Sequence, residues 1–104
     1  MADLFKALSD PTRLKIINLL TESQNLCVGV ISEKTGMSQP AISQHLKILK
    51  TAGILDARKM GLEVHYSINP KKVKEFKDIV NTLFASKPRH NCTECPKSLK
   101  KKKN

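Results

Sequence analysis

One stretch of the chain decides its fold: Met37-Ser38-Gln39-Pro40-Ala41-Ile42-Ser43-Gln44-His45-Leu46-Lys47-Ile48-Leu49. Ser38 is a favoured N-cap residue, and Pro40 falls in the first helical turn, where its missing N–H group and fixed φ cost nothing. A helix should therefore begin here, and Gly53 should end it.

The two sides of this predicted helix differ in chemistry. Its apolar residues recur at helical spacing and form one narrow stripe of Ile42, Leu46 and Leu49. Its other surfaces carry Gln39, Ser43, Gln44 and Lys47. Solvated helices usually carry Glu and Lys, whereas amides, hydroxyls and an imidazole can both donate and accept hydrogen bonds toward base edges or phosphates. The polar face is therefore expected to contact a specific partner.

The residues before this helix predict a helix-turn-helix. A short helix should occupy residues 26–35, and Gly36 should stop it. Only Met37 then separates this glycine from Ser38, so a tight turn joins the two helices. A short helix, a glycine turn and a second helix with polar residues at its N-terminal end together make the helix-turn-helix pattern.

Two further helices are expected nearer the N-terminus. The first spans residues 3–8, and Asp10 caps a second helix that opens at Pro11. The second helix has a broad apolar face, which implies that it is central and largely buried. This face consists of Leu14, Ile16, Ile17, Leu19 and Leu20. Its remaining residues should stay in water, namely Thr12, Arg13, Lys15 and Asn18.

The C-terminal half predicts a β-hairpin and a last helix. Residues 54–59 and 64–68 read as strands around a turn at 60–63, and a hairpin directly after such a helix makes a wing. Asn69 and Pro70 then start the last helix. The expected fold class is mainly α with a small β-hairpin wing, in the order ααααββα.

The last helix carries an apolar stripe that has to find a partner: Val73, Phe76, Ile79, Val80, Leu83 and Phe84. Of the four aromatic residues, three lie in the first and last helices, at Phe5, Phe76 and Phe84. Large ring area outside the central helices indicates that these two helices bury each other across a two-fold axis, which gives a homodimer. The alternative is that they cap the core of one protomer.

Charge and length bound the possible partners. The chain has 104 residues, the size of one domain, and a net charge of +10, which favours polyanions such as nucleic acid or an anionic membrane face. Five lysines gather near the C-terminus: Lys97, Lys100, Lys101, Lys102 and Lys103. Without them the net charge falls from +10 to +5, so the rest of the chain is still basic. We expect a folded domain at residues 1–86 and a flexible, basic, cysteine-containing tail at residues 87–104.

The role of the three cysteines depends on whether the protein lies in a reducing or an oxidising compartment. No apolar run approaches the roughly 20 residues that span a bilayer, and Met1-Ala2-Asp3-Leu4-Phe5 lacks the features of a signal peptide. We therefore expect a cytoplasmic protein with no membrane partner. In that reducing compartment Cys27, Cys92 and Cys95 are core residues, metal ligands or redox thiols rather than a disulfide framework.

Several segments in order and spacing resemble the ArsR/SmtB family of winged helix-turn-helix repressors: Leu8-Ser9-Asp10-Pro11-Thr12-Arg13-Leu14-Lys15-Ile16, Leu26-Cys27-Val28, Met37-Ser38-Gln39-Pro40-Ala41-Ile42-Ser43-Gln44-His45-Leu46-Lys47 and Leu49-Lys50-Thr51-Ala52-Gly53-Ile54. The resemblance implies that residues 1–86 form a DNA-binding and dimerisation domain. It implies a dimer that binds an imperfect palindrome through the fourth helix and the wing. It also implies release from DNA when a metal, metalloid or oxidant acts on a sensor site.

Two sensor sites of this family are incomplete here. Members that sense arsenic or cadmium at the third helix often read Cys-Val-Cys, but Gly29 replaces the second cysteine and leaves Cys27 alone. Members that sense zinc or nickel on the last helix often show Asp-x-His, but Asp78 is followed by Ile79 and Val80.

The residues expected to contact DNA come from the stretch 37–49 and the wing. They are Ser38, Gln39, Ser43, Gln44, His45, Lys47, Arg58 and Lys59, with His65 as a further wing candidate. The amide side chains suit adenine edges, and Ser43 suits several bases. Ser38 and Lys47 suit phosphates. For His45, a packed histidine is an equally supported interpretation.

The expected inducer site lies in the tail. Cys92 and Cys95 are two residues apart, a spacing that lets both thiolates bind one soft cation. We expect a thiophilic ion as inducer, best matched by trivalent arsenic or antimony, and no organic cofactor. Arsenic prefers three sulfurs, so Cys27 is either the third ligand or, between Leu26 and Val28, a buried small hydrophobe.

Three functions compete. The leading one is a repressor that leaves its operator when a thiophilic ion binds cysteine thiolates. The second is a redox-switch repressor on the same fold, in which an oxidant closes a disulfide. The third is a small thiol oxidoreductase, which is disfavoured because its Cys-x-x-Cys lies in a charged tail rather than at a helix N-terminus after a strand. No other catalytic constellation is visible, so we expect no enzyme.

Overall fold

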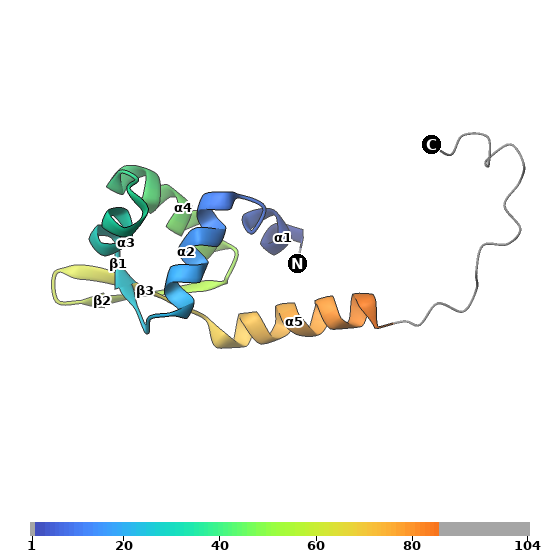
Figure 1. Ribbon diagram of the computed structural model, residues 1–104. Helices are drawn as coiled ribbons and strands as arrows, with labels where there is room; N and C mark the ends of the chain where they lie inside the picture. Colours follow the sequence, from blue (N-terminus) through green and yellow to red (C-terminus); the bar gives the residue numbers. More distant parts are fainter. Residues whose placement is uncertain (1, 86–104) are drawn as a thin grey trace, which may run out of the picture.

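The computed structural model describes residues 2–85, which form helices around one small sheet. In chain order the elements are α1 (Ala2–Ala7), α2 (Pro11–Thr21), β1 (Leu26–Cys27), α3 (Val28–Thr35), α4 (Gln39–Thr51), β2 (Leu55–Met60), β3 (Glu63–Ile68) and α5 (Pro70–Phe84). Figure 1 shows α1 to α4 gathered on one side of the sheet, whereas α5 projects away from them. The expected mainly α fold with a hairpin wing is confirmed.

The strand β1 departs from the predicted order, because residues 26 and 27 were expected to begin the third helix. It pairs antiparallel with β3, through Leu26 with Tyr66 and Cys27 with His65, so β3 lies in the centre of the sheet. A strand of two residues has no periodicity of its own. Only its pairing with the distant hairpin reveals it, and α3 therefore starts later, at Val28.

Three helix starts are held by side-chain caps, of which Asp10 and Ser38 were predicted as caps and Asn69 was predicted only as the start of its helix. Each cap side chain accepts a hydrogen bond from the backbone N–H of the residue three positions later in the chain. The caps are Asp10 for α2, Ser38 for α4 and Asn69 for α5. A proline follows in the first turn of each helix, where it needs no hydrogen-bond partner. Helix α4 ends at Thr51, and Gly53 follows with φ of +90°, a conformation that residues with a Cβ atom rarely adopt.

The core joins α1 to α4 with the start of β2. Its buried members are Leu4, Ala7, Ile16, Leu20, Ile31, Ile42, Leu46, Leu49, Ile54 and Leu55. The predicted stripe of α4 is confirmed, since Ile42, Leu46 and Leu49 are each 0% exposed. Burying such a side chain contributes about 1.5–3 kcal/mol, so three of them fix the rotation of α4 about its axis.

Two expectations for α2 are wrong. Its apolar face is not largely buried: Ile16 and Leu20 are buried, Ile17 packs against the core only partly buried, and Leu14 is 50% exposed. The elements that pack against α2 within one protomer cover only part of its apolar face, and Leu14 lies on the uncovered part. Arg13 is not simply solvated either, since it is half-buried and its Nε donates to the carbonyl of Ala7 at 2.6 Å.

The hairpin and α5 leave the core at opposite ends. Strands β2 and β3 pair in register from Leu55 with Ile68 to Met60 with Glu63, and Gly61 lies in the turn between them. The rest of the chain, including the predicted tail with Cys92 and Cys95, lies outside the described residues. Within residues 2–85 no helix is long and apolar enough to cross a membrane.

Candidate nucleic-acid interface

The turn between α3 and α4 is fixed by side chains of α3. Gly36 closes α3 in the left-handed conformation, with φ of +73°. The hydroxyl of Ser32 donates to the carbonyl of Met37, and the hydroxyl of Thr35 accepts from the N–H of Met37 at 3.3 Å. These bonds fix the turn that leads through the cap residue Ser38 into α4, which begins at Gln39.

The outer face of α4 is exposed as predicted. Its side chains Gln39, Ser43, Gln44 and Lys47 are all exposed. Ser38 is exposed as well, although its hydroxyl already accepts the N–H of Ala41 at 3.3 Å as the helix cap. Because the opposite stripe of α4 is buried in the core, this polar face is presented from a helix that is held in place.

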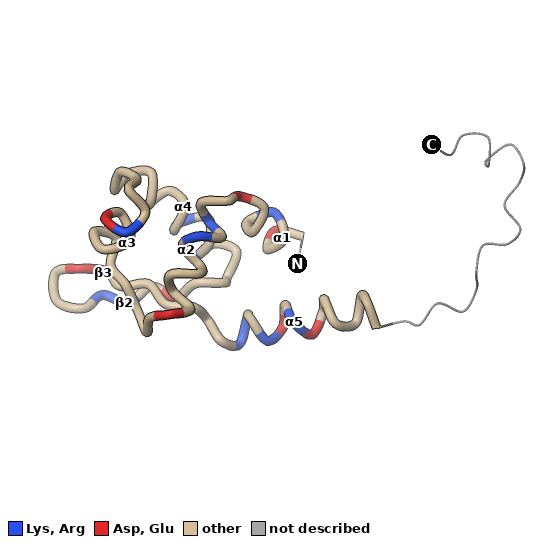
Figure 2. The backbone as a smooth tube through the Cα atoms, viewed as in Figure 1, with Lys and Arg blue, Asp and Glu red and all other residues tan. Residues whose placement is uncertain are grey.

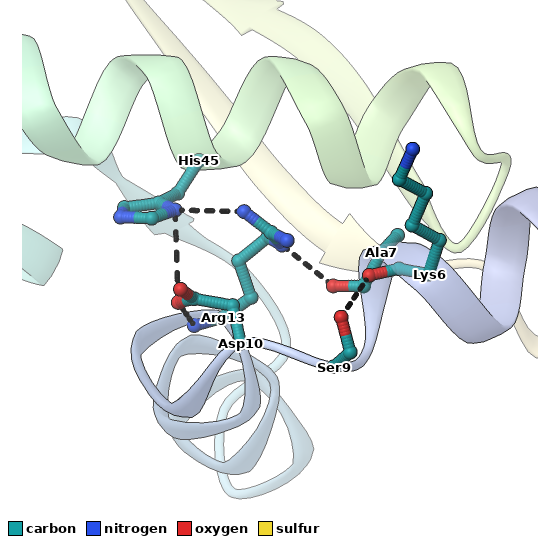
Figure 3. Close-up of polar contacts among 6 residues, drawn as sticks. All are labelled: Lys6, Ala7, Ser9, Asp10, Arg13 and His45. Atoms are coloured by element: carbon teal, nitrogen blue, oxygen red, sulfur yellow. Dashed lines mark hydrogen bonds and ion pairs between the residues drawn. The ribbon is translucent and has the colours of Figure 1, made fainter.

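His45 points in another direction, toward the start of α2 (Figure 3). Its Nδ1 atom lies 3.3 Å from Nη1 of Arg13 and 3.9 Å from Oδ2 of Asp10. Since a guanidinium only donates, Nδ1 is the acceptor in this contact. His45 thus ties α4 to α2, which favours the packed interpretation over a base contact.

Asp10 and Arg13 complete this cluster, which the sequence did not mark as part of the site. Oδ2 of Asp10 accepts the backbone N–H of Arg13 at 3.0 Å. This hydrogen bond, together with the positive charge of Arg13, lowers the pKa of Asp10 below its ordinary value of 3.8. Arg13 also reaches the carbonyl of Ala7, so three helices, α1, α2 and α4, meet at one side chain. The only feature of the sequence that relates Arg13 to this cluster is its position three residues after the cap Asp10.

The wing presents its two cations on opposite faces. Arg58 and Lys59 are exposed neighbours on β2, and successive side chains of a strand point to opposite sides. His65, the further candidate, is half-buried on β3, where its Nδ1 lies 2.6 Å from Oδ1 of Asn25 and its Nε2 lies 3.8 Å from Glu63. Its ring is therefore already hydrogen-bonded to Asn25.

The structure gives a partial answer for the cysteines. Cys27 is half-buried at the junction of β1 and α3, so it is not the fully buried hydrophobe that one interpretation expected. Its place at the end of a two-residue strand, outside the main core, explains this. Among residues 2–85, no group of three or more His, Cys, Asp or Glu side chains is arranged to hold a metal ion. Cys92 and Cys95 lie outside the described residues.

Comparison with known proteins agrees with this geometry. Residues 10–57 match the family described as "Bacterial regulatory protein, arsR family". An uncharacterized HTH-type transcriptional regulator of Methanocaldococcus jannaschii is 48% identical over 82 residues, which are 79% of this chain and 92% of that protein. The chain belongs to the arsR family. It is thus a DNA-binding transcriptional regulator of the winged helix-turn-helix type.

Two further similarities bear on this arsR-family chain. The arsenical resistance operon repressor of Escherichia coli is 48% identical over 67 residues, which are 64% of this chain and 57% of that protein. The homodimeric winged helix-turn-helix DNA-binding domain of a possible ArsR-family regulator from Mycobacterium bovis superposes with a TM-score of 0.67 at 29% identity. The superposition covers 86% of this chain and 85% of that domain.

Proposed function

We propose that this chain is a repressor that binds a palindromic operator as a homodimer. The observation that carries the proposal is the exposed polar face of α4 above a completely buried stripe. The proposed DNA contacts are Ser38, Gln39, Ser43, Gln44 and Lys47 on α4 with Arg58 and Lys59 on the wing. His45 is assigned a positioning role through Arg13 and Asp10 instead.

The homodimer is supported by the surface of α5. No residue of this helix is buried, and Ile79, Leu83 and Phe84 are 40%, 65% and 78% exposed. Large apolar side chains in one row favour a protein partner. The similar domain from Mycobacterium bovis is homodimeric, and a two-fold dimer reads two half-sites of a palindrome.

The proposed inducer is a thiophilic ion, with trivalent arsenic as the best match. The similar Escherichia coli protein is named an arsenical resistance repressor. In this chain the proposed ligands are the thiolates of Cys92 and Cys95, because two sulfurs separated by two residues can share one soft ion. An oxidant acting on the same pair is the competing explanation.

The test begins with an operator selected from a pool of random duplexes, followed by mobility-shift titrations. Arsenite, antimonite, cadmium, lead and zinc are added one at a time in excess reductant, and an oxidant is added in a separate metal-free series. Release by an ion in reductant supports metal sensing, whereas release by the oxidant alone supports the redox switch. If the wild-type chain enriches no duplex sequence, the DNA-binding proposal fails.

A double substitution locates the sensor. Cys92→Ser with Cys95→Ser should bind the operator as the wild type does but no longer release it, because a hydroxyl is a poor ligand for a soft ion. Cys27→Ser, made separately, tests whether the third thiol is also a ligand. Release of the double variant at the wild-type concentration of inducer would place the sensor elsewhere.

A further inference from the structure

A cleft of about 370 Å³ lies between α1 and the C-terminal half of α4. Lys6 of α1, Arg13 of α2 and Lys47 of α4 line it together with one acidic residue, Asp3. The ion pairs found among residues 2–85 involve none of the three cations. Much of the lining is apolar, from Ala7, Ile48 and Ala52, and its charged members are three cations against one carboxylate. The charged groups of the cleft therefore favour an anion.

Arg13 is held in place before any ligand arrives. Its Nε donates to the carbonyl of Ala7 and its Nη1 donates to His45, so both α1 and α4 hold the guanidinium. A guanidinium has five N–H donors, and these two bonds leave three for an anion. Arginine donors arranged in this way match phosphate oxygens well.

The position of the cleft on α4 indicates where such an anion comes from. Lys47, Ile48 and Thr51 line the cleft and follow Gln44 at spacings of three, four and seven residues. Residues at those spacings share one face of a helix. The cleft therefore continues the exposed face that carries Gln44, and a duplex lying on that face extends over it.

From these observations we propose that the cleft binds a backbone phosphate of the operator, with Lys6 and Arg13 as contacts in addition to Lys47. This inference rests on the proposed function. It extends the DNA interface from the helix-turn-helix and the wing to the N-terminal helix α1. The hydroxyl of Thr51, on the same wall, is available as a neutral donor to the same phosphate.

The test compares Lys6→Gln with Lys71→Gln, which removes the same charge from an exposed position on α5. Ethylation interference on the selected operator identifies each phosphate whose ethylation blocks binding. Wild type and the Lys71 variant should give the same pattern, whereas the Lys6 variant should become insensitive at one phosphate in each half-site. Lys6→Arg should restore the wild-type pattern.

The salt dependence gives an independent readout of the same contact. Each lost phosphate contact makes the negative slope of log K against log salt concentration shallower by about 0.9, hence by about 1.8 for a dimer. The loss should be equal on operator and random duplexes, because a phosphate carries no sequence information. Thermal unfolding of the Lys6 variant should match the wild type, since Lys6 is exposed.

The outcomes separate this inference from the function on which it rests. If the wild type selects an operator but the Lys6 variant keeps its interference pattern and salt slope, the cleft does not contact DNA and the inference is overturned. Inorganic phosphate provides the remaining comparison. If it perturbs the NMR signals of Arg13 while the Lys6 variant keeps the wild-type pattern on DNA, the cleft holds an adventitious ion only, and the inference is again overturned.

Discussion

Helices α4 and α5 share an amphipathic design but differ in what covers their apolar sides. On α4, Ile42, Leu46 and Leu49 are each 0% exposed, whereas no residue of α5 is buried. Figure 2 shows charged residues along the first turns of α5 and none in its last turns. Those last turns carry Leu83 and Phe84, which are 65% and 78% exposed.

The difference shows that a periodic apolar stripe does not state which molecule will cover it. The core of one protomer covers α4, so the polar face of that helix has a fixed direction. Only the first part of α5 packs within the protomer, where Val73 and Phe76 are partly buried and the ring of Phe76 lies 5.0 Å from that of Phe5. Capping of the core thus accounts for the first part of α5, and the proposed pairing with a second protomer concerns the rest of the helix.

The largest effect is expected from Leu46→Ala on α4. Truncating a fully buried leucine costs about 2–5 kcal/mol, because it removes apolar contacts and leaves a cavity. Urea unfolding at fixed protein concentration measures the change in the free energy of unfolding. A loss no greater than that of Leu83→Ala, measured at a concentration too low for dimers, would remove the contrast between the two helices.

A smaller effect is expected from Leu83→Ala, and it should depend on concentration. If a second protomer covers this side chain, each truncation removes about 1.5–3 kcal/mol of burial from the dimer and little from the single protomer. Analytical ultracentrifugation should show a weaker dimer, and operator binding should then vary with protein concentration. Lys71→Ala, an exposed change on the same helix, is the control. An unchanged dimer would mean that another surface joins the protomers.

Sequence predicted the elements that depend on local signals. The caps at Asp10 and Ser38, the helix start at Asn69 and the buried stripe of α4 follow from spacing and side-chain chemistry within a few residues. The strand β1 was missed because two residues carry no period and pair with a hairpin about forty positions away.

The site was predictable to the same extent. Gln39, Ser43, Gln44 and Lys47 were placed correctly on the exposed face, since their direction follows from the stripe. Arg13 was assigned to water because helical periodicity places it outside the apolar face of α2. Its contacts come from Ala7 on one side and His45 on the other, and no local pattern contains both.

Base reading by α4 should give an intermediate effect. Gln44→Ala removes a side chain able to pair with a base edge, and each lost base contact costs about 1–3 kcal/mol of specific binding. The dimer should stay folded, because Gln44 is exposed. Mobility shifts on operator and random duplexes provide the comparison. Equal losses on both would show that Gln44 does not read bases.

The smallest effect is expected from Asp10, whose carboxylate lies beside the contact between Arg13 and His45 of α4. Asp10→Asn keeps an N-cap, since Asn caps about as well as Asp, but removes the charge beside Arg13 and His45. The pKa of Asp10 is lowered in the folded protein, chiefly by the backbone N–H of Arg13.

Its charge therefore stabilises the fold above the ordinary value of 3.8, and this contribution is lost as the pH falls through the lower folded value. The Tm of the wild type should exceed that of the variant at neutral pH, and the gap should close in acid below that value. On α5, Asp78→Asn breaks an exposed pair with Lys74 at 2.9 Å and should change the Tm little at any pH. If both variants gave the same pH-independent shift, the contact of Asp10 would contribute no more than an exposed ion pair, and apolar burial alone would distinguish α4 from α5.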